Sequence, residues 1–113
     1  MAAAKLDITI EQGANFHMAF VVSGALTDLT GYSARMQVRR NVSDTDPVIS
    51  LDSAGHGITI SLPATISIDV NATTTAAYSF DDGVYDFELV AGDGYVRRLL
   101  YGTCTLSKEV TRG

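Results

Sequence analysis

The sequence predicts an all-β fold, an antiparallel sandwich of seven to nine strands, and three observations lead to this prediction. First, apolar and polar residues alternate along most of the chain, with the period of two that a half-buried strand has. Second, turn-forming residues interrupt the alternation about every eight to twelve positions, as they do in sandwiches. Third, the segment Asp81–Leu89 reads Asp-x-Gly-x-Tyr-x-Phe where a late strand begins.

This third segment has the spacing of a tyrosine corner, in which a Tyr near the start of a late strand bonds to the backbone of the preceding turn. We expect Tyr85 to make this bond, Gly83 to allow the tight turn and Asp81 to tether it. Tyr85, Phe87 and Leu89 then share one face of the strand. The corner predicts an immunoglobulin-like β-sandwich, although Phe87 stands where such domains usually carry a cysteine.

The first half of the chain supplies three alternating segments. Their inward-facing apolar rows are Leu6, Ile8 and Ile10; Phe16, Met18, Phe20 and Val22; and Tyr32, Ala34, Met36 and Val38. A turn at 11–15 separates the first two rows, and a loop at 23–31 separates the second from the third. A polar loop at 41–47 ends this half of the chain.

The second half predicts shorter strands, one helical turn and a hairpin. The shorter strands are Val48–Asp52, Ile58–Leu62 and Ile66–Val70. Asn71 is suited to cap a short helical turn near 71–77, where sandwich folds cross from one sheet to the other. The segments 84–90 and 95–106 then form a hairpin around the glycine-rich turn at 91–94.

The composition indicates one domain over residues 1–113, because a chain of 113 residues can bury a core of its own. The single cysteine, Cys104, excludes an internal disulfide bond. The N-terminus lacks the apolar core of a signal peptide, and no apolar run is long enough to span a bilayer. We therefore expect synthesis in a cytoplasm and no membrane partner.

The net charge of −5 argues against nucleic acid as a partner, since binding to phosphates needs clustered cations. The only basic concentrations are Arg39-Arg40 and Arg97-Arg98. The outward-facing Asp86 and Glu88 would form cross-strand ion pairs if the strand that carries Arg35 and Arg39 lies beside them.

No group of residues predicts catalysis, so we expect no enzyme, no cofactor and no metal. His17 and His56 lack the spacing of paired metal ligands or of a catalytic pair. Cys104 falls at a predicted core position, where a thiol acts as a small apolar side chain. The segments 44–46 and 81–82 offer carboxylates to calcium but lack the further ligands of a calcium loop.

An outward row of apolar residues, Val84, Val90, Leu99 and Tyr101, is the candidate docking surface for a partner. Two other interpretations stay open. Bulges in the long last strand can turn some of these residues inward, and single exposed apolar residues need have no role. The short segments Val48–Asp52 and Ile58–Leu62 are a second route to a partner, because edge strands accept strands from other chains.

Four segments, in chain order, resemble the motifs of a family of small tailed-phage virion proteins. The early segments are 6–16, LDITIEQGANF, and 29–39, LTGYSARMQVR. The late segments are 83–89, GVYDFEL, and 98–112, RLLYGTCTLSKEVTR. Members of the family carry I-x-Q-G, then D-L-T-G-Y-x-A-R-M-Q, then G-x-Y-D-L-E-L and a final R-L-L-x-G. Phe87 replaces the Leu of the third motif.

The resemblance implies a non-enzymatic structural component of a virion, with an immunoglobulin-like sandwich. It implies partners among the other virion proteins of the tail, baseplate, fibre or capsid, and several copies or a homo-oligomer in the particle. It carries no catalytic or ligand residue onto this chain. The expected role is an adaptor of the tail, baseplate or fibre-attachment region that docks through a sheet face or edge.

Two alternatives to the adaptor stay open. The first, within the virion, is a capsid decoration protein. The second is a carbohydrate- or receptor-binding sandwich module, which would need surface aromatic residues arranged as a stacking platform. Tyr78, Tyr95 and Tyr101 are the candidates for such a platform, and the chain has no Trp.

Overall fold

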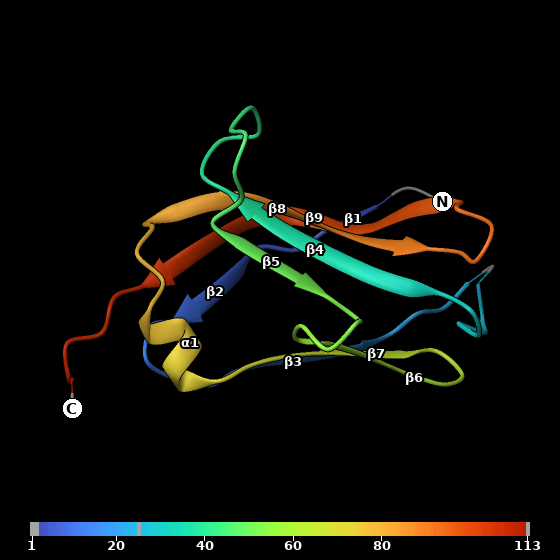
Figure 1. Ribbon diagram of the computed structural model, residues 1–113, viewed down its shortest axis with the longest axis horizontal. Coiled ribbons are helices and arrows are strands. Elements are labelled where there is room, and N and C mark those ends of the chain that lie inside the picture. The colour runs from blue at the N-terminus through green and yellow to red at the C-terminus, as the bar shows by residue number, and fades with distance from the viewer. Residues whose placement is uncertain (1–2, 25, 113) are drawn as a thin grey trace.

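The computed structural model describes residues 3–24 and 26–112, which form nine strands in two sheets and one short helix (Figure 1). The elements are β1 (Ala4–Lys5), β2 (Ile8–Glu11), β3 (Phe16–Val21), β4 (Ser33–Arg39), β5 (Ile49–Asp52), β6 (Ile58–Ser61), β7 (Thr65–Val70), α1 (Ala72–Ala76), β8 (Asp82–Val90) and β9 (Val96–Ser107). The predicted mainly-β sandwich with one short helix is confirmed at this level. The helix is five residues long, so no helix of the described chain is long or apolar enough to cross a membrane.

The larger sheet has six strands, and the smaller sheet has three. In the larger sheet, β1 and β2 both pair with β9 in parallel, and β8, β4 and β5 follow in antiparallel order. The smaller sheet has the order β3, β7, β6, with antiparallel pairing throughout. The strands β5 and β6 therefore lie at sheet edges, as the sequence predicted for both of them.

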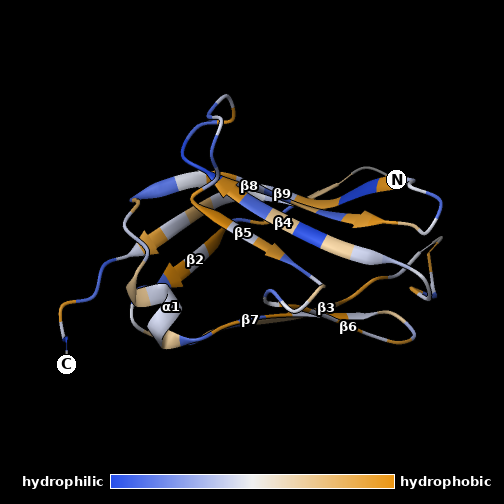
Figure 2. Cartoon of the chain, in the orientation of Figure 1, coloured by the Kyte–Doolittle hydropathy of each residue, from blue (hydrophilic) through white to orange (hydrophobic). Residues whose placement is uncertain are grey.

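The core lies between the two sheets and is built mainly from the alternating rows that the sequence predicts. Leu6 is an exception: it was predicted to face inward but is 42% exposed, because it lies in the segment between β1 and β2. Met36 and Phe87 of the larger sheet and Ile66 and Ile68 of the smaller sheet are fully buried. The Phe20 ring of β3 meets the Phe87 ring of β8 edge to face, with centroids 5.5 Å apart and an interplanar angle of 81°. Hydrophobic and hydrophilic residues alternate visibly along β4 in Figure 2.

The helix α1 carries the chain from β7 of the smaller sheet to β8 of the larger one, at one end of the sandwich (Figure 1). Asn71 caps it as predicted, because its side-chain oxygen accepts from the Thr74 N–H at 2.8 Å. Thr75 is fully buried. Its hydroxyl donates to the Ala14 carbonyl at 2.8 Å and accepts from the Gly13 N–H at 3.0 Å, so the helix is fastened to the turn after β2.

Candidate docking face

The outer face of the larger sheet carries a cluster of charged and polar side chains from β4, β8 and β9. Alternation along β4 and β8 sends every second residue outward. Three outward residues of β4 lie opposite three of β8: Arg35 opposite Glu88, Gln37 opposite Asp86, and Arg39 opposite Val84. Arg98 of β9 lies opposite Glu88 on its other side.

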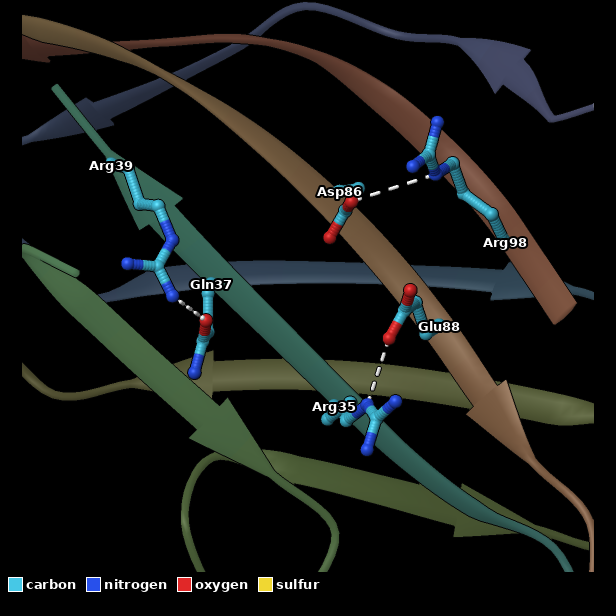
Figure 3. A network of polar contacts seen from close by, with 6 residues as sticks. All are labelled: Arg35, Gln37, Arg39, Asp86, Glu88 and Arg98. Carbon is cyan, nitrogen blue, oxygen red and sulfur yellow. Dashed lines mark hydrogen bonds and ion pairs between the residues drawn. The ribbon is translucent and has the colours of Figure 1, made fainter. Parts of the chain in front are cut away.

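Two ion pairs cross this face (Figure 3). Arg35 Nε lies 2.8 Å from Glu88 Oε1, and Arg98 Nε lies 3.5 Å from Asp86 Oδ2. Partial burial raises the pKa of Asp86, and the nearby Glu88 carboxylate raises it further. The arginine side chains of both pairs are more than half exposed to solvent, so each pair contributes only about 0.2–1 kcal/mol. The predicted cross-strand pairing is confirmed for Arg35.

Arg39 makes a different set of contacts from the one predicted. Its Nη1 donates to the backbone carbonyls of Asp44 and Thr45, at 2.8 and 2.7 Å, and its Nη2 donates to Gln37 Oε1 at 2.7 Å. These acceptors are neutral, and no carboxylate of the described chain forms an ion pair with Arg39. The guanidinium thereby fastens the loop at 40–48, which projects from the body of the sandwich (Figure 1).

A groove of about 540 Å³ lies between this loop and the outward side chains of β8 and β9. Three of its lining residues are apolar and exposed, namely Val42, Val84 and Tyr101, and Val42 is 85% exposed. Its charged lining consists of three cations, Lys5, Arg39 and Arg98, and two carboxylates, Asp86 and Glu88. The groove is therefore net positive by one charge on a chain whose net charge is −5.

The structure separates the four predicted docking residues. Val84 and Tyr101 both line the groove. Val90 points to the same side of the sheet, but it lies at the far end of β8, opposite Val96, and does not line the groove. The fourth residue, Leu99, is 9% exposed and packs in the core.

The prediction for Leu99 is wrong, and a β-bulge is the reason. The pairing of β8 with β9 passes from Phe87 opposite Leu100 to Glu88 opposite Arg98. Leu99 is thus the extra residue of β9. The predicted alternation holds from Leu100 onward, but it is reversed for Leu99 and the residues of β9 before it. The alternative interpretation, in which a bulge turns part of the row inward, is confirmed for this residue.

The predicted tyrosine corner is also corrected. The Tyr85 hydroxyl donates to the carbonyl of Leu6, between β1 and β2, and not to the turn before β8. Burial raises the pKa of Tyr85 to about 12, so the hydroxyl keeps its proton at neutral pH. Asp81 does not tether the turn through its side chain, because its carboxylate is exposed and lies 3.3 Å from Lys108 Nζ.

Gly83 has a packing role in place of the predicted turn role. A Cβ at this position would lie 2.5 Å from the carbonyl oxygen of Arg39, so β8 and β4 approach too closely here for any side chain. Of the three predicted corner residues, Tyr85 keeps a hydrogen bond to backbone with a different partner, while Asp81 and Gly83 act elsewhere.

Two further side-chain pairs lie outside the groove. His17 Nδ1 lies 2.6 Å from Asp69 Oδ1, and His56 Nδ1 lies 2.8 Å from Asp52 Oδ1. Within residues 3–24 and 26–112, no three His, Cys, Asp or Glu side chains gather closely enough to hold a metal ion. Cys104 is fully buried as predicted, and this burial raises its thiol pKa to about 11.

Lys5 and Val42 are among the groove residues that sequence reasoning missed. Lys5 reaches it because β1 pairs with β9 in parallel and places Lys5 opposite Tyr101, a long-range register that no local pattern indicates. Val42 did leave a signal, since it is the one large apolar residue in the polar loop at 41–46.

Comparisons with known proteins assign no family or function to this chain. No protein-family model matches the chain, and no curated protein sequence is significantly similar to it.

Proposed function

We propose that this chain is a non-enzymatic structural protein of a tailed-phage virion, an adaptor of the tail, baseplate or fibre-attachment region. It docks on larger virion proteins through the outer face of its larger sheet, and it is present in several copies. The four sequence segments that resemble phage virion proteins support the virion part of this proposal. The groove supports the docking part.

The observation that carries the docking face is the exposure of three apolar side chains beside charged ones. Val42, Val84 and Tyr101 line one groove, with Lys5 and Arg39 at its walls. Exposed apolar residues rimmed by polar ones are typical of surfaces that bind other proteins. The groove lies on a continuous part of the sheet, because β8 is hydrogen-bonded to β9 on one side and to β4 on the other.

We also propose an immunoglobulin-like topology for the sandwich. Strand order supports it: β9, β8, β4 and β5 in one sheet correspond to G, F, C and C′, and β3, β7 and β6 in the other correspond to B, E and D. The helix α1 lies in the crossing that would join E to F. A solved structure with a different strand order would overturn this topology and leave the docking face in place.

The experiment that tests the function is quantitative mass spectrometry of purified particles, with heads and tails separated. A few to a few tens of copies that travel with the tails are expected. Hundreds of copies on the heads would make the chain a capsid decoration protein. Absence from both fractions would overturn the virion proposal and favour a binding module of another kind.

The carbohydrate-binding alternative has no specific observation in its favour. Tyr78 packs beside Phe80, and Tyr95 lies next to the hairpin turn with the Arg97 guanidinium 4.9 Å from its ring. Tyr101 lines the groove, and neither Tyr78 nor Tyr95 does. The three tyrosines therefore form no common stacking platform.

A further inference from the structure

We propose that the groove takes a short acidic segment of a partner protein, bound in an extended form with one apolar side chain seated against Val84 and Tyr101. This inference rests on the proposed function, because it names the chemistry of the partner that the docking face takes. Three features of the groove carry it: its charges, its apolar floor and its shape.

The charges select an acidic partner. Glu88 and Asp86 are already paired with Arg35 and Arg98. Arg39 contacts only neutral acceptors, and Lys5 forms no ion pair with any residue of the described chain. Two cations at the groove walls are therefore available to carboxylates from outside, and a carboxylate there would add charge-assisted hydrogen bonds.

The apolar floor of the groove indicates that the partner supplies an apolar side chain as well as negative charge. Exposed ion pairs are weak and screened by salt, so an acidic segment alone would bind poorly. Val84 is 38% and Tyr101 42% exposed, and Val42 of the loop lines the same groove. A large apolar side chain of the partner would remove all three from water, which is how anchor residues supply most of the affinity at protein interfaces.

The shape favours a segment over a second copy of this chain. A groove of about 540 Å³ has the size of a site for a few residues. The loop at 40–48 projects beyond the sandwich (Figure 1), and Arg39 holds it there, so two such faces cannot lie flat against each other.

The test uses fluorescence polarisation with a labelled synthetic peptide, Gly-Asp-Glu-Phe-Glu-Asp-Gly, and the full chain. Two control peptides carry Lys in place of every acid, or Ala in place of Phe. We expect the acidic Phe peptide to bind, both controls to bind at least about tenfold more weakly, and binding to weaken with salt, as screening requires. Lys5→Glu and Tyr101→Ser should each weaken binding by a similar factor.

The matched control variant is Lys108→Glu, which makes the same charge change on a residue outside the groove. It should bind the peptide as the unaltered chain does. If Lys5→Glu and Lys108→Glu lose the same amount of peptide affinity, the loss comes from the net charge of the chain. This result would overturn the proposed site. No saturable binding of the acidic Phe peptide at millimolar concentration would also overturn it.

Four more outcomes would change the assignment of the groove or of the virion role. Concentration-dependent dimers that Tyr101→Ser abolishes would assign the groove to a second copy and overturn the peptide. Saturable binding of an acidic oligosaccharide such as an oligoguluronate, with none of the peptide, would assign it to a glycan. If the chain binds the peptide but is absent from particles, only the virion role is overturned. If the chain is found in particles but binds no peptide, only this inference is overturned.

Discussion

The Tyr85 hydroxyl donates a hydrogen bond to the carbonyl of Leu6, 79 residues earlier in the chain. Gly102 of β9 lies directly opposite Tyr85, and its missing side chain lets the phenol reach past β9 to the segment that joins β1 to β2. The strands on either side of this segment, β1 and β2, both pair with β9, and the Leu6 N–H itself donates to the Tyr101 carbonyl at 2.8 Å. The Tyr85 side chain thus fastens the β1–β2 segment to β8, across the strand β9 with which that segment pairs.

We expect Tyr85→Phe to lower the free energy of unfolding by about 1–2 kcal/mol, because it removes a hydrogen bond and leaves the Leu6 carbonyl without its side-chain donor. Chemical unfolding followed by tyrosine fluorescence or circular dichroism measures the change. The matched control is Tyr95→Phe, since Tyr95 is 59% exposed and its hydroxyl bonds to no described residue. If both variants unfold like the unaltered chain, the bond to Leu6 contributes nothing to stability.

Gly102→Ala should destabilise the protein by about 1–3 kcal/mol through overpacking. A Cβ at this position would lie 2.5 Å from the Leu6 carbonyl oxygen and 2.8 Å from Asp7 Oδ1. Neither atom can move away freely, because Leu6 is bonded to Tyr85 and Asp7 accepts from the Thr103 N–H.

Gly92→Ala is the control for this change. A Cβ at Gly92 would make an ordinary contact of 3.6 Å with the Gly31 carbonyl. We expect its thermal unfolding midpoint to match that of the unaltered chain or to rise slightly, since Ala has less freedom in the unfolded chain. A Gly102→Ala protein with an unchanged midpoint would show that the β1–β2 segment is free to shift.

Local patterns were sufficient to predict the sandwich and its helix. Alternation placed Phe87 and Leu89 in the core, and both are fully buried. The capping bond of Asn71 could be predicted because its acceptor, Asn71 Oδ1, and its donor, the Thr74 N–H, are only three residues apart. Sequence reasoning succeeds where a hydrogen-bond partner lies close in the chain. It also succeeds where burial depends only on the alternation of inward and outward residues along one strand.

The groove and the Tyr85 hydrogen bond depend on how strands far apart in the chain pair with each other. The alternation of residues along a single strand does not indicate that pairing. Leu99 was assigned to the wrong face because one extra residue in β9 reverses the alternation, and nothing in the local sequence marks the bulge. Tyr85 predicted a hydrogen bond to backbone, but the choice of Leu6 as acceptor depends on β1 and β2 lying beside β9. Half of the predicted docking row, Val84 and Tyr101, lies in the groove.

Asp7 should make part of the stability depend on pH in the acid range. The hydrogen bonds from Thr103 lower the pKa of the Asp7 carboxyl below its ordinary value of 3.8. The unfolded chain therefore binds this proton more readily, so the contribution is complete above that ordinary value and is lost as the pH falls through the folded pKa.

We expect Asp7→Asn to lose less stability than the unaltered chain between pH 7 and pH 3, because the amide oxygen still accepts from Thr103 but does not titrate. Urea unfolding at both pH values measures this difference. Asp46→Asn is the control, since the exposed Asp46 carboxylate accepts no hydrogen bond from the described chain. Identical pH dependence in Asp7→Asn and the unaltered protein would rule out this contribution of Asp7.

Cys104 should be unreactive in the folded protein and reactive once it unfolds. The thiol is fully buried opposite Ile8 and Gly83, and burial raises its pKa to about 11. The buried thiol therefore stays almost entirely protonated at pH 8, and the thiolate is the nucleophile. Because Cys104 is the single cysteine, the release of thionitrobenzoate from Ellman's reagent reports on this thiol alone.

We expect modification of the native protein to be at least about a hundredfold slower than in denaturing guanidinium chloride, with a rate that follows opening of the β2–β9–β8 region. Gly102→Ala should speed native modification, because it loosens that region, and Gly92→Ala should leave the rate unchanged. A native thiol that reacts as fast as the unfolded one would contradict the burial of Cys104 and, with it, the pairing of β2 against β9.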